Sequence, residues 1–268
     1  MFLQQHVSIS VIIPTRNEAE NLRHVLPYIP SIVDEVILVD GQSTDDTIAV
    51  ARQLLPAIQV IEQKGKGKGG AIREGIAASS GDIIVMLDAD GSADPEEIPC
   101  FVEALLAGHD FAKGSRFRAG GGSQDITLLR WAGNFALSTL VNILFKAHFS
   151  DLCYGYNAFW KHCLDHVEID RGGFEIETLI NIRMHKARLK IIEVPSFEYQ
   201  RIYGVSKLNT FKDGWRVLMT ILKERRRKAT PPAQLPHLAK ALEVWEPPST
   251  SEELVSVVMD RHGTHNEL

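Results

Sequence analysis

The sequence predicts an α/β protein with a mostly parallel central sheet and helices on both faces. Short apolar runs typical of strands alternate four times with segments of helical pattern, as in a parallel sheet built from strand and helix units. The run from Asp82 to Gly91 is the clearest strand, because its five consecutive apolar residues suit a strand buried on both faces. Polar residues follow several of these strands, at the edge where such sheets bind ligands.

The predicted elements follow the chain in order. Residues 7–13 are predicted to form the first strand, and Asn17 to cap a helix that runs through Leu22 and Leu26. Two glutamates in the first turn of that helix support this prediction, because the helix dipole favours acids there. The other predicted elements are strands at residues 35–39, 58–61 and 110–114 and helices around residues 72–76, 94–97 and 211–228.

The composition is that of an ordinary globular protein, since 44% of its 268 residues are hydrophobic and 24% are charged. A net charge of −5 argues against non-specific binding of nucleic acid. Three scattered cysteines form neither a disulfide framework nor a zinc site, which suits a reducing, cytoplasmic compartment. No signal peptide and no uninterrupted apolar run of about 18 residues is visible, so we expect no segment to span a bilayer.

Two aspartates end the strand that begins at Asp82. Asp88 and Asp90 are two residues apart, so in an extended chain they point the same way, and Gly91 lets the backbone turn directly after them. Side by side they repel each other unless a cation or hydrogen-bond donors lie between them. Such hard oxygen ligands suit Mg²⁺ or Mn²⁺, whose shell water and substrate phosphate complete. In the structural alternative Asp88 caps a loop and Asp90 begins a turn.

A segment rich in glycine and lysine, residues 64–70, lies between a predicted strand and a predicted helix. Its glycines spell G-x-G-x-x-G, the pattern of dinucleotide-binding domains. That fingerprint belongs to the first strand and helix of a domain, whereas two such units precede it here. We therefore interpret the glycines as positions where the backbone approaches a nucleotide or a sugar, with Lys66 or Lys68 near a phosphate. In the alternative interpretation the lysines belong to a solvated turn.

Four motifs in the first half of the chain resemble glycosyl transferase family 2, whose members have the GT-A fold. They are I-S-V-I-I-P-T-R-N-E around Pro14, V-D-G-Q-S-T-D-D-T around Asp40, G-K-G around Lys66 and L-D-A-D-G around Asp90. The resemblance implies a nucleotide-diphospho-sugar transferase fold. It also disfavours a polysaccharide synthase, because the Q-x-x-R-W signature of those enzymes is absent.

The second half of the chain resembles the dolichol-phosphate mannosyltransferases and their bacterial polyprenyl-phosphate relatives. The motifs are G-S-R-F at residues 114–117, D-L-C-Y-G-Y at 151–156, F-E-I-E at 174–177, E-V-P at 193–195 and R-I-Y-G-V-S-K-L at 201–208. On this basis residues 1–228 are predicted to form the catalytic domain, ending in an amphipathic helix. Residues 229–268 are rich in proline and are predicted to form a flexible tail without a catalytic role.

The resemblance implies a nucleoside diphosphate sugar as the donor, of the GDP-mannose or UDP-glucose type. The donor-binding residues that it implies are Pro14, Arg16, Glu18, Asp40, Lys68, Asp88, Ala89 and Asp90, with Asp88 and Asp90 holding Mg²⁺ or Mn²⁺. Three positions depart from the family pattern. Arg16 replaces a frequent aromatic residue, Gly41 a second acid and Ser92 a glutamine of the metal site. These departures leave the preferred nucleobase and the metal affinity open.

The resemblance implies a polyprenyl or dolichyl phosphate as the acceptor and inversion at the anomeric carbon. A lipid monophosphate is mostly anionic near neutral pH, its second pKa being about 6, so it needs cations more than a base. The residues implied to act in transfer are Asp90, Arg116, Arg130, Arg201, Ser206 and Lys207. A hydroxyl acceptor, the first alternative, needs a carboxylate base such as Glu177 or Asp151. The second alternative is a nucleotide-sugar binding protein without turnover.

Two segments bear on membrane association. Residues 126–149 are apolar on a broad helical face, which three polar residues interrupt. Residues 211–228 are predicted to form an amphipathic helix that carries Trp215 and ends in a basic run, a pattern suited to an anionic membrane surface. Packing of this helix on the domain is the alternative. We expect a cytoplasmic protein that associates peripherally with the cytoplasmic membrane face, with a short helix at residues 252–259 of the tail.

Overall fold

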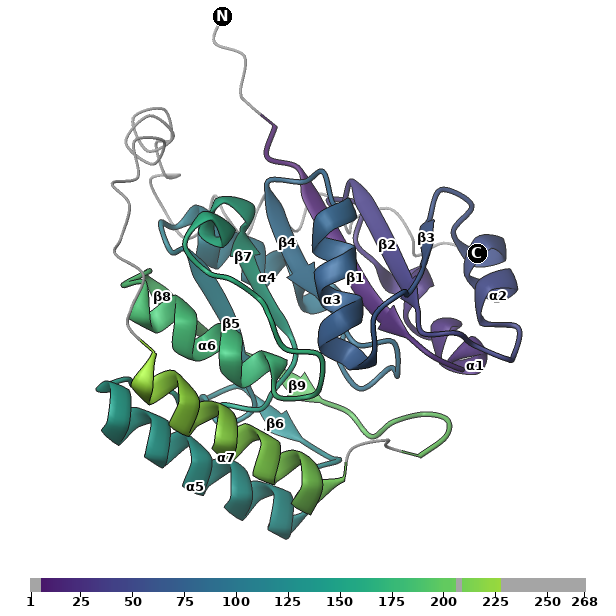
Figure 1. The fold of residues 1–268 in the computed structure, drawn as a ribbon. Coiled ribbons are helices and arrows are strands. Elements are labelled where there is room, and N and C mark those ends of the chain that lie inside the picture. Colours follow the sequence, from purple (N-terminus) through teal and green to yellow (C-terminus); the bar gives the residue numbers. More distant parts are fainter. Residues whose placement is uncertain (1–5, 206–208, 228–268) are drawn as a thin grey trace, which may run out of the picture. The chain divides into compact units, whose positions relative to one another are not determined.

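A seven-stranded sheet organises the residues that the computed structural model describes, 6–205 and 209–227 (Figure 1). The strands are β1 (Ile9–Thr15), β2 (Glu35–Asp40), β3 (Gln59–Glu62), β4 (Ile83–Met86), β5 (Phe111–Ser115), β7 (Asn157–Trp160) and β8 (Ile191–Pro195). Their order is β3-β2-β1-β4-β7-β5-β8. The pairs are parallel except where β7 runs antiparallel to β4 and β5. The predicted fold class is confirmed.

Helices cover both faces of this sheet. They are α1 (Ala19–Leu22), α2 (Thr47–Leu54), α3 (Gly67–Ala78), α4 (Ile98–Leu106), α5 (Leu128–Phe145), α6 (Ile176–Lys186) and α7 (Thr210–Arg226). Three 3-10 helices are η1 (Leu26–Tyr28), η2 (Pro95–Glu97) and η3 (Lys161–Asp165). One apolar core joins the sheet to α1, α2 and α4, and the second joins it to α3 and α6. Val11 and Ile12 enter opposite cores because successive strand residues face opposite ways.

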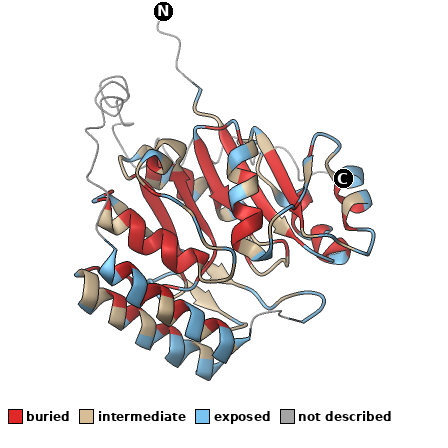
Figure 2. Ribbon diagram, viewed as in Figure 1, coloured by how far each residue is buried: buried red, intermediate tan, exposed pale blue. Residues whose placement is uncertain are grey.

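Strand β4 is the central strand of the seven-stranded sheet, and all four of its residues are buried, in agreement with the red strands of Figure 2. It pairs with β1 on one side and β7 on the other. Ile83 and Val85 pack in the first core, whereas Ile84 and Met86 pack in the second. The prediction of a strand buried on both faces is therefore confirmed. Its carboxyl end lies beside the ends of β1 and β2, which places the residues after these three strands together.

The helix after β1 is shorter than predicted, and its cap differs. Helix α1 has four residues and begins at Ala19, after Glu18 rather than Asn17. Asn17 has a left-handed backbone, with φ of 55°, and its side-chain oxygen accepts a hydrogen bond from Thr44 N at 2.8 Å. The helix ends at Leu22, and Leu26 begins the separate 3-10 helix η1 with Pro27 in its first turn, so the prediction that one helix runs through Leu26 is wrong.

Helices α5 and α7 pack against each other beside α6, as seen at the lower edge of Figure 1. Val141, Val217 and Ile221 meet there in a third apolar core. Among the described residues α5 alone is long and apolar enough to cross a membrane, with a mean hydropathy of 1.3. This corrects the expectation that no segment qualifies, because the polar interruptions lower the mean only slightly. Length and composition are the only grounds, and α5 is packed on the domain.

A second, two-stranded sheet pairs β6 (Gly122–Ser123) with β9 (Phe197–Glu198), in parallel. The chain that leaves β9 passes back towards β4, where Tyr199 N donates a hydrogen bond to Ser92 O at 2.7 Å. This connection carries Arg201 to the carboxyl edge of the main sheet. The predicted tail at residues 229–268, its short helix at 252–259, and the predicted site residues Ser206 and Lys207 lie outside the described residues.

Candidate active site

A cavity of about 790 Å³ opens at the carboxyl ends of β1 to β4 and extends between α5 and α7. The predicted residues that line it are Pro14, Arg16, Glu18, Lys68, Asp88, Ala89, Asp90, Arg116, Arg130 and Arg201. Asp40 is the exception among the predicted donor residues in the described part of the chain. It is buried beside the cavity, where one carboxylate oxygen accepts from Ser43 N at 3.0 Å and the other has no hydrogen-bond partner. Its contact with the nucleoside stays a prediction.

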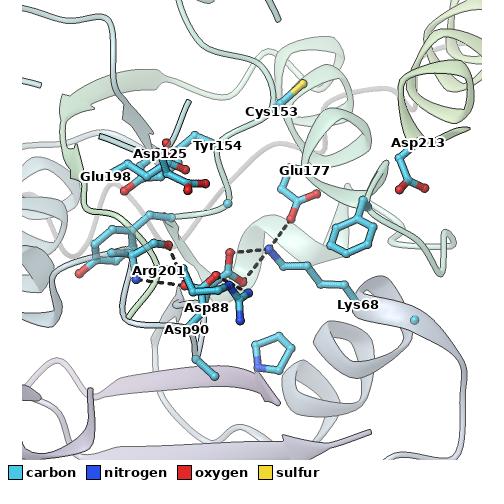
Figure 3. A pocket seen from close by; sticks show the side chains of 18 of the residues that line it. Lys68, Asp88, Asp90, Asp125, Cys153, Tyr154, Glu177, Glu198, Arg201 and Asp213 are labelled. Carbon is cyan, nitrogen blue, oxygen red and sulfur yellow. Dashed lines mark hydrogen bonds and ion pairs between the residues drawn. The ribbon is translucent and has the colours of Figure 1, made fainter. Parts of the chain in front are cut away.

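Asp88 and Asp90 follow β4, and each has a cation of the protein beside it (Figure 3). The backbone turns at Gly91, whose φ is 74°, a conformation that glycine adopts without strain. Asp90 Oδ1 accepts hydrogen bonds from Ser92 N at 3.0 Å and Ser92 Oγ at 2.7 Å. Asp90 therefore begins a turn through its Oδ1, as the structural alternative predicted. Its Oδ2 faces Arg201.

Lys68 links Asp88 to Glu177, and we name these three residues the lysine chain. The Lys68 ammonium lies 2.6 Å from Asp88 Oδ1, 2.8 Å from Asp88 Oδ2 and 2.8 Å from Glu177 Oε1. Lys68 comes from the first turn of α3 and Glu177 from the first turn of α6, as Figure 3 shows. Burial opposes the charge of Lys68, but the carboxylates of Asp88 and Glu177 outweigh it and raise the pKa. Lys68 is therefore a cation.

Arg201 links Asp90 to Glu18, and we name these three residues the arginine chain. Arg201 Nη2 lies 2.7 Å from Asp90 Oδ2, and Nη1 lies 3.2 and 3.1 Å from the two oxygens of Glu18. The segment that carries Arg201 is fastened to α1. Asn21 Oδ1 accepts from Tyr203 N at 2.9 Å, and Asn21 Nδ2 donates to Tyr203 O at 3.1 Å. Glu18 thus forms an ion pair with Arg201 and also lines the cavity.

The lysine and arginine chains together reduce the repulsion predicted between Asp88 and Asp90, because each aspartate has a cation of the protein beside it. Each chain places one cation between two carboxylates, so each carries a formal charge of −1 and the pair of chains a charge of −2. Within the described residues no three His, Cys, Asp or Glu side chains are grouped to hold a metal ion. A divalent ion at this site therefore has two protein carboxylates available and an excess negative charge that suits it.

Arg116 was predicted to contact the acceptor, and in the structure carboxylates surround it. Its Nε and Nη2 donate to Asp151 at 2.7 and 3.0 Å, and Nη1 donates to both oxygens of Glu198 at 3.1 and 3.0 Å. The guanidinium also lies 4.9 Å from the ring of Tyr154. Burial opposes ionisation of Asp151, but Arg116 outweighs it and lowers the pKa of that carboxyl. Arg116 joins β5, β9 and the segment before β7, and its contact with an acceptor stays a prediction.

Arg130 lies on the first turn of α5, at the wall of the cavity. Its Nη1 is 3.3 Å from Asp125 Oδ2, and about a quarter of its side chain is exposed (27%). The first turn begins after Thr127, whose hydroxyl accepts from Arg130 N at 3.3 Å. This cap fixes the start of α5 and thereby the place of Arg130 in the cavity wall.

The glycine-rich segment packs against residues 171–172. Gly69 N donates to Gly172 O at 3.0 Å, and a Cβ on Gly67 or Gly69 collides with the backbone of residues 171–172. Gly67 and Gly69 therefore admit another part of the protein, while Gly65 and Gly67 also line the cavity, and their approach to a nucleotide or a sugar stays a prediction. A sequence cannot reveal this packing, because the two segments are about a hundred residues apart. Lys66 still lines the cavity, whereas Lys68 points inward to Asp88.

Gly155 has a role in the site that sequence reasoning missed. A Cβ at this position lies 2.8 Å from Lys68 Nζ, 3.0 Å from Asp88 Oδ2 and 3.4 Å from Glu177 Oε1. A side chain at this position requires these charged groups to shift. The only signal in the sequence was the D-L-C-Y-G-Y motif. Its glycine has no reactive side chain, so the motif alone did not indicate a role for Gly155. Glu177 was considered as a base and not as the partner of a lysine.

Comparison with known proteins places these features in a family. A sequence model described as Glycosyl transferase family 2 matches residues 10–166. A dolichol-phosphate mannosyltransferase of Pyrococcus furiosus is 33% identical over 75% of this chain, which spans only 59% of that relative. A dolichyl-phosphate hexose transferase of Haloferax volcanii is 30% identical over 80% of this chain and 92% of its own length. A polyprenol monophosphomannose synthase of Mycolicibacterium smegmatis is 30% identical over 74% and 80%.

Solved structures share the fold. Glucosyl-3-phosphoglycerate synthase from Mycobacterium tuberculosis in complex with Mg²⁺ and UDP superposes with a TM-score of 0.65 at 23% identity, over 82% of this chain and 80% of that one. The same protein with Mn²⁺, UDP and phosphoglyceric acid gives a TM-score of 0.65 at 23% identity, over 82% and 78%. At this identity the likeness establishes the GT-A type of fold.

Proposed function

We propose that this chain, which belongs to glycosyl transferase family 2, transfers a single hexose from a nucleoside diphosphate sugar to a polyprenyl phosphate with inversion. The observation that carries the proposal is the continuity of the cavity. Its walls include Pro14 and Arg16 at the sheet edge, Asp88 and Asp90, and residues of α5 and α7. The same cavity thus lies along the sheet edge, where the family resemblance implies the donor, and along two helices with exposed apolar side chains.

Asp88 and Asp90 are the residues that would hold a divalent ion, Mg²⁺ or Mn²⁺. The fit rests on the charge of −2 of the two chains and on the exposure of both carboxylates, 35% for Asp88 and 19% for Asp90. Such an ion stabilises the negative charge that the departing nucleoside diphosphate gains. The related synthase of Mycobacterium tuberculosis, crystallised with Mn²⁺ and UDP, supports this assignment. Pro14, Arg16 and Glu18 would hold the donor beside it.

A phosphate acceptor agrees with the ion pairs of the two candidate bases, Asp151 and Glu177. Asp151 is fully buried under Arg116, and Glu177 is bonded to Lys68, so neither carboxylate is directed at a hydroxyl group in the cavity. A phosphate oxygen of the acceptor is already anionic and attacks the anomeric carbon without losing a proton. The bond from that carbon to the nucleoside diphosphate breaks as the new bond forms. Arg130 would place the phosphate, because it lines the cavity beyond the aspartates.

The outer faces of α5 and α7 support an acceptor that lies in a membrane. The large apolar side chains exposed there are Leu128, Leu129, Trp131, Phe135 and Ile143 on α5 and Phe211, Trp215 and Leu222 on α7. The last turn of α7 carries Lys223, Arg225 and Arg226. Tryptophan and phenylalanine beside basic residues are typical of helices that lie in the plane of an anionic membrane surface. We therefore propose peripheral binding at the cytoplasmic membrane face.

A transfer assay with three acceptor arms tests the proposal. The full chain is incubated with Mn²⁺ and labelled GDP-mannose or UDP-glucose, together with undecaprenyl phosphate, with phosphoglyceric acid or with no acceptor. We expect label in the lipid extract of the first arm only. Label on phosphoglyceric acid alone contradicts the lipid acceptor and supports a soluble one. Binding of a nucleotide sugar without label in any arm supports a binding protein without turnover.

A further inference from the structure

Lys68 uses its whole hydrogen-bonding capacity within the lysine chain. An ammonium group has three N–H donors, and the three nearest oxygens belong to Asp88 and Glu177, at 2.6, 2.8 and 2.8 Å. The side chain of Lys68 is 14% exposed and that of Glu177 is 4% exposed. Both residues start helices that pack on the same face of the sheet. Figure 3 shows the three groups in contact at the inner wall of the cavity.

A divalent ion on Asp88 competes with Lys68 for the same carboxylate. Asp88 has two oxygens, and the ammonium contacts both. If Asp88 were the only partner of Lys68, a metal ion that takes Asp88 would leave a buried cation without a counter-charge, which is strongly unfavourable. Glu177 removes this conflict. Once Asp88 turns to the ion, Lys68 keeps the carboxylate of Glu177 at 2.8 Å.

We propose that Glu177 is a positioning residue that retains Lys68 when Asp88 binds the metal ion of the proposed function. The inference rests on that function, because it concerns the uptake of the ion. Glu177 acts through Lys68 and touches neither substrate nor metal. Gly155 completes the arrangement, since a side chain there would separate Lys68 from both carboxylates.

The arginine chain has the same plan, with Glu18 in the place of Glu177. Arg201 keeps two contacts with Glu18, at 3.2 and 3.1 Å, if Asp90 turns to the ion. The support differs, however. Arg201 lies on the segment between β9 and α7, outside any helix or strand, whereas Lys68 is fixed to α3. Arg201 can therefore move with Asp90 or away from it. For this reason we expect the metal affinity to depend more strongly on Glu177 than on Glu18.

Binding of Mn²⁺ to the full chain, without donor or acceptor, tests the inference by a readout other than turnover. Free Mn²⁺ is measured by electron paramagnetic resonance during titration. We expect Glu177→Gln to weaken binding by about 10- to 100-fold, because Lys68 then depends on Asp88 alone for charge. The matched control is Glu175→Gln, the same change two residues earlier and without an ion pair to Lys68. It should bind Mn²⁺ as the unaltered chain does.

The double variant Glu177→Gln with Lys68→Met separates positioning from a merely structural role. Without the lysine no cation competes for Asp88, so Mn²⁺ binding should return to within about threefold of the unaltered chain, as coupled pairs show in double-mutant cycles. Lys68→Met alone should bind Mn²⁺ at least as tightly as the unaltered chain. The Mn²⁺ affinities of the double variant and of Lys68→Met can be measured even if Glu177→Gln alone does not fold.

Three results overturn the inference. Unchanged Mn²⁺ binding in Glu177→Gln shows that Glu177 does not retain Lys68, while the proposed metal use stands. Weak binding in a folded double variant, checked by circular dichroism, shows that Glu177 only supports the local structure. Absence of Mn²⁺ binding in the unaltered chain removes the metal from the proposed function and the inference with it.

Discussion

The lysine chain and the arginine chain place the same charges around the two aspartates on different supports. Lys68 and Glu177 begin helices that are packed on the sheet, and Lys68 is buried. Arg201 arrives on a connecting segment that two hydrogen bonds with Asn21 fasten to α1. The first chain is therefore fixed by the core of the fold, whereas the second depends on local contacts. We therefore infer that the lysine chain fixes the geometry of the proposed metal site, whereas the arginine chain can change its geometry when substrate binds.

Asp90→Asn breaks the arginine chain and removes a proposed metal ligand, and it should have the largest effect. We expect hexose transfer to fall by about 100- to 1000-fold or more, because the charge that stabilises the leaving group is lost with the metal. The measurement is the initial rate with labelled donor and undecaprenyl phosphate. Asp94→Asn is the control, since Asp94 caps η2 and takes no part in either chain. Near-normal turnover in Asp90→Asn would remove Asp90 from the metal site.

Arg201→Lys keeps the charge of the arginine chain but loses its fork of donors. One ammonium group cannot hold Asp90 and both oxygens of Glu18 as the guanidinium does. We expect transfer to fall by about 10- to 100-fold, with donor affinity by calorimetry nearly unchanged. Arg118→Lys is the control, because Arg118 forms an exposed pair with Glu193. A parallel loss of donor affinity would assign Arg201 to the donor diphosphate, and no change at all would make it a surface arginine.

Gly155→Ala perturbs the lysine chain without changing a charge. The added methyl group lies 2.8 Å from Lys68 Nζ, so Lys68 must move away from Asp88 or Glu177. We expect a loss of transfer of about 10-fold, which corresponds to one weakened charged hydrogen bond. Gly133→Ala is the control in the same cavity wall, because its methyl group meets open space. Equal rates for the two variants would show that the geometry of the lysine chain is not critical.

Asn21→Ala loosens the arginine chain at its anchor, and the effect should be the smallest. It removes the two hydrogen bonds to Tyr203 and the one that Asn21 Nδ2 donates to Glu18 at 2.5 Å, but it leaves Arg201 and both of its carboxylate partners. We expect transfer to fall by about threefold, since a hydrogen bond contributes about 1 kcal/mol and the ion pairs of Arg201 remain. The KM for the acceptor should rise while kcat changes little. A loss as large as that of Arg201→Lys would mean that the anchor, and not the arginine, sets the geometry.

The sequence was sufficient to predict where the site forms. β4 is a continuous apolar run, so its burial on both faces followed from composition alone. Parallel neighbours end at one edge of a sheet, and this brings Pro14 and Asp88 to one cavity as predicted. Asp40 ends the adjacent strand and is buried next to the cavity. The family motifs added the donor and acceptor classes, which no pattern of strands and helices contains.

The ion pairs of the site could not be predicted in the same way. Lys68 precedes Asp88 by 20 residues and Glu177 follows it by 89, so no local spacing relates them. Repulsion between Asp88 and Asp90 was foreseen, but the cations that relieve it come from α3 and from the segment after β9. The short α1 and the contacts of Gly67 and Gly69 also depend on distant neighbours. Tertiary packing decides each of these features.

The product of the reaction tests the central claim most directly. Undecaprenyl phosphate and a nucleoside diphosphate hexose are incubated with the full chain and Mn²⁺, and the lipid is examined by mass spectrometry and by NMR of the anomeric proton. The account predicts one hexose per lipid phosphate, with the anomeric configuration opposite to that of the donor. A ladder of several hexoses, a retained configuration, or a lipid without added sugar would contradict it.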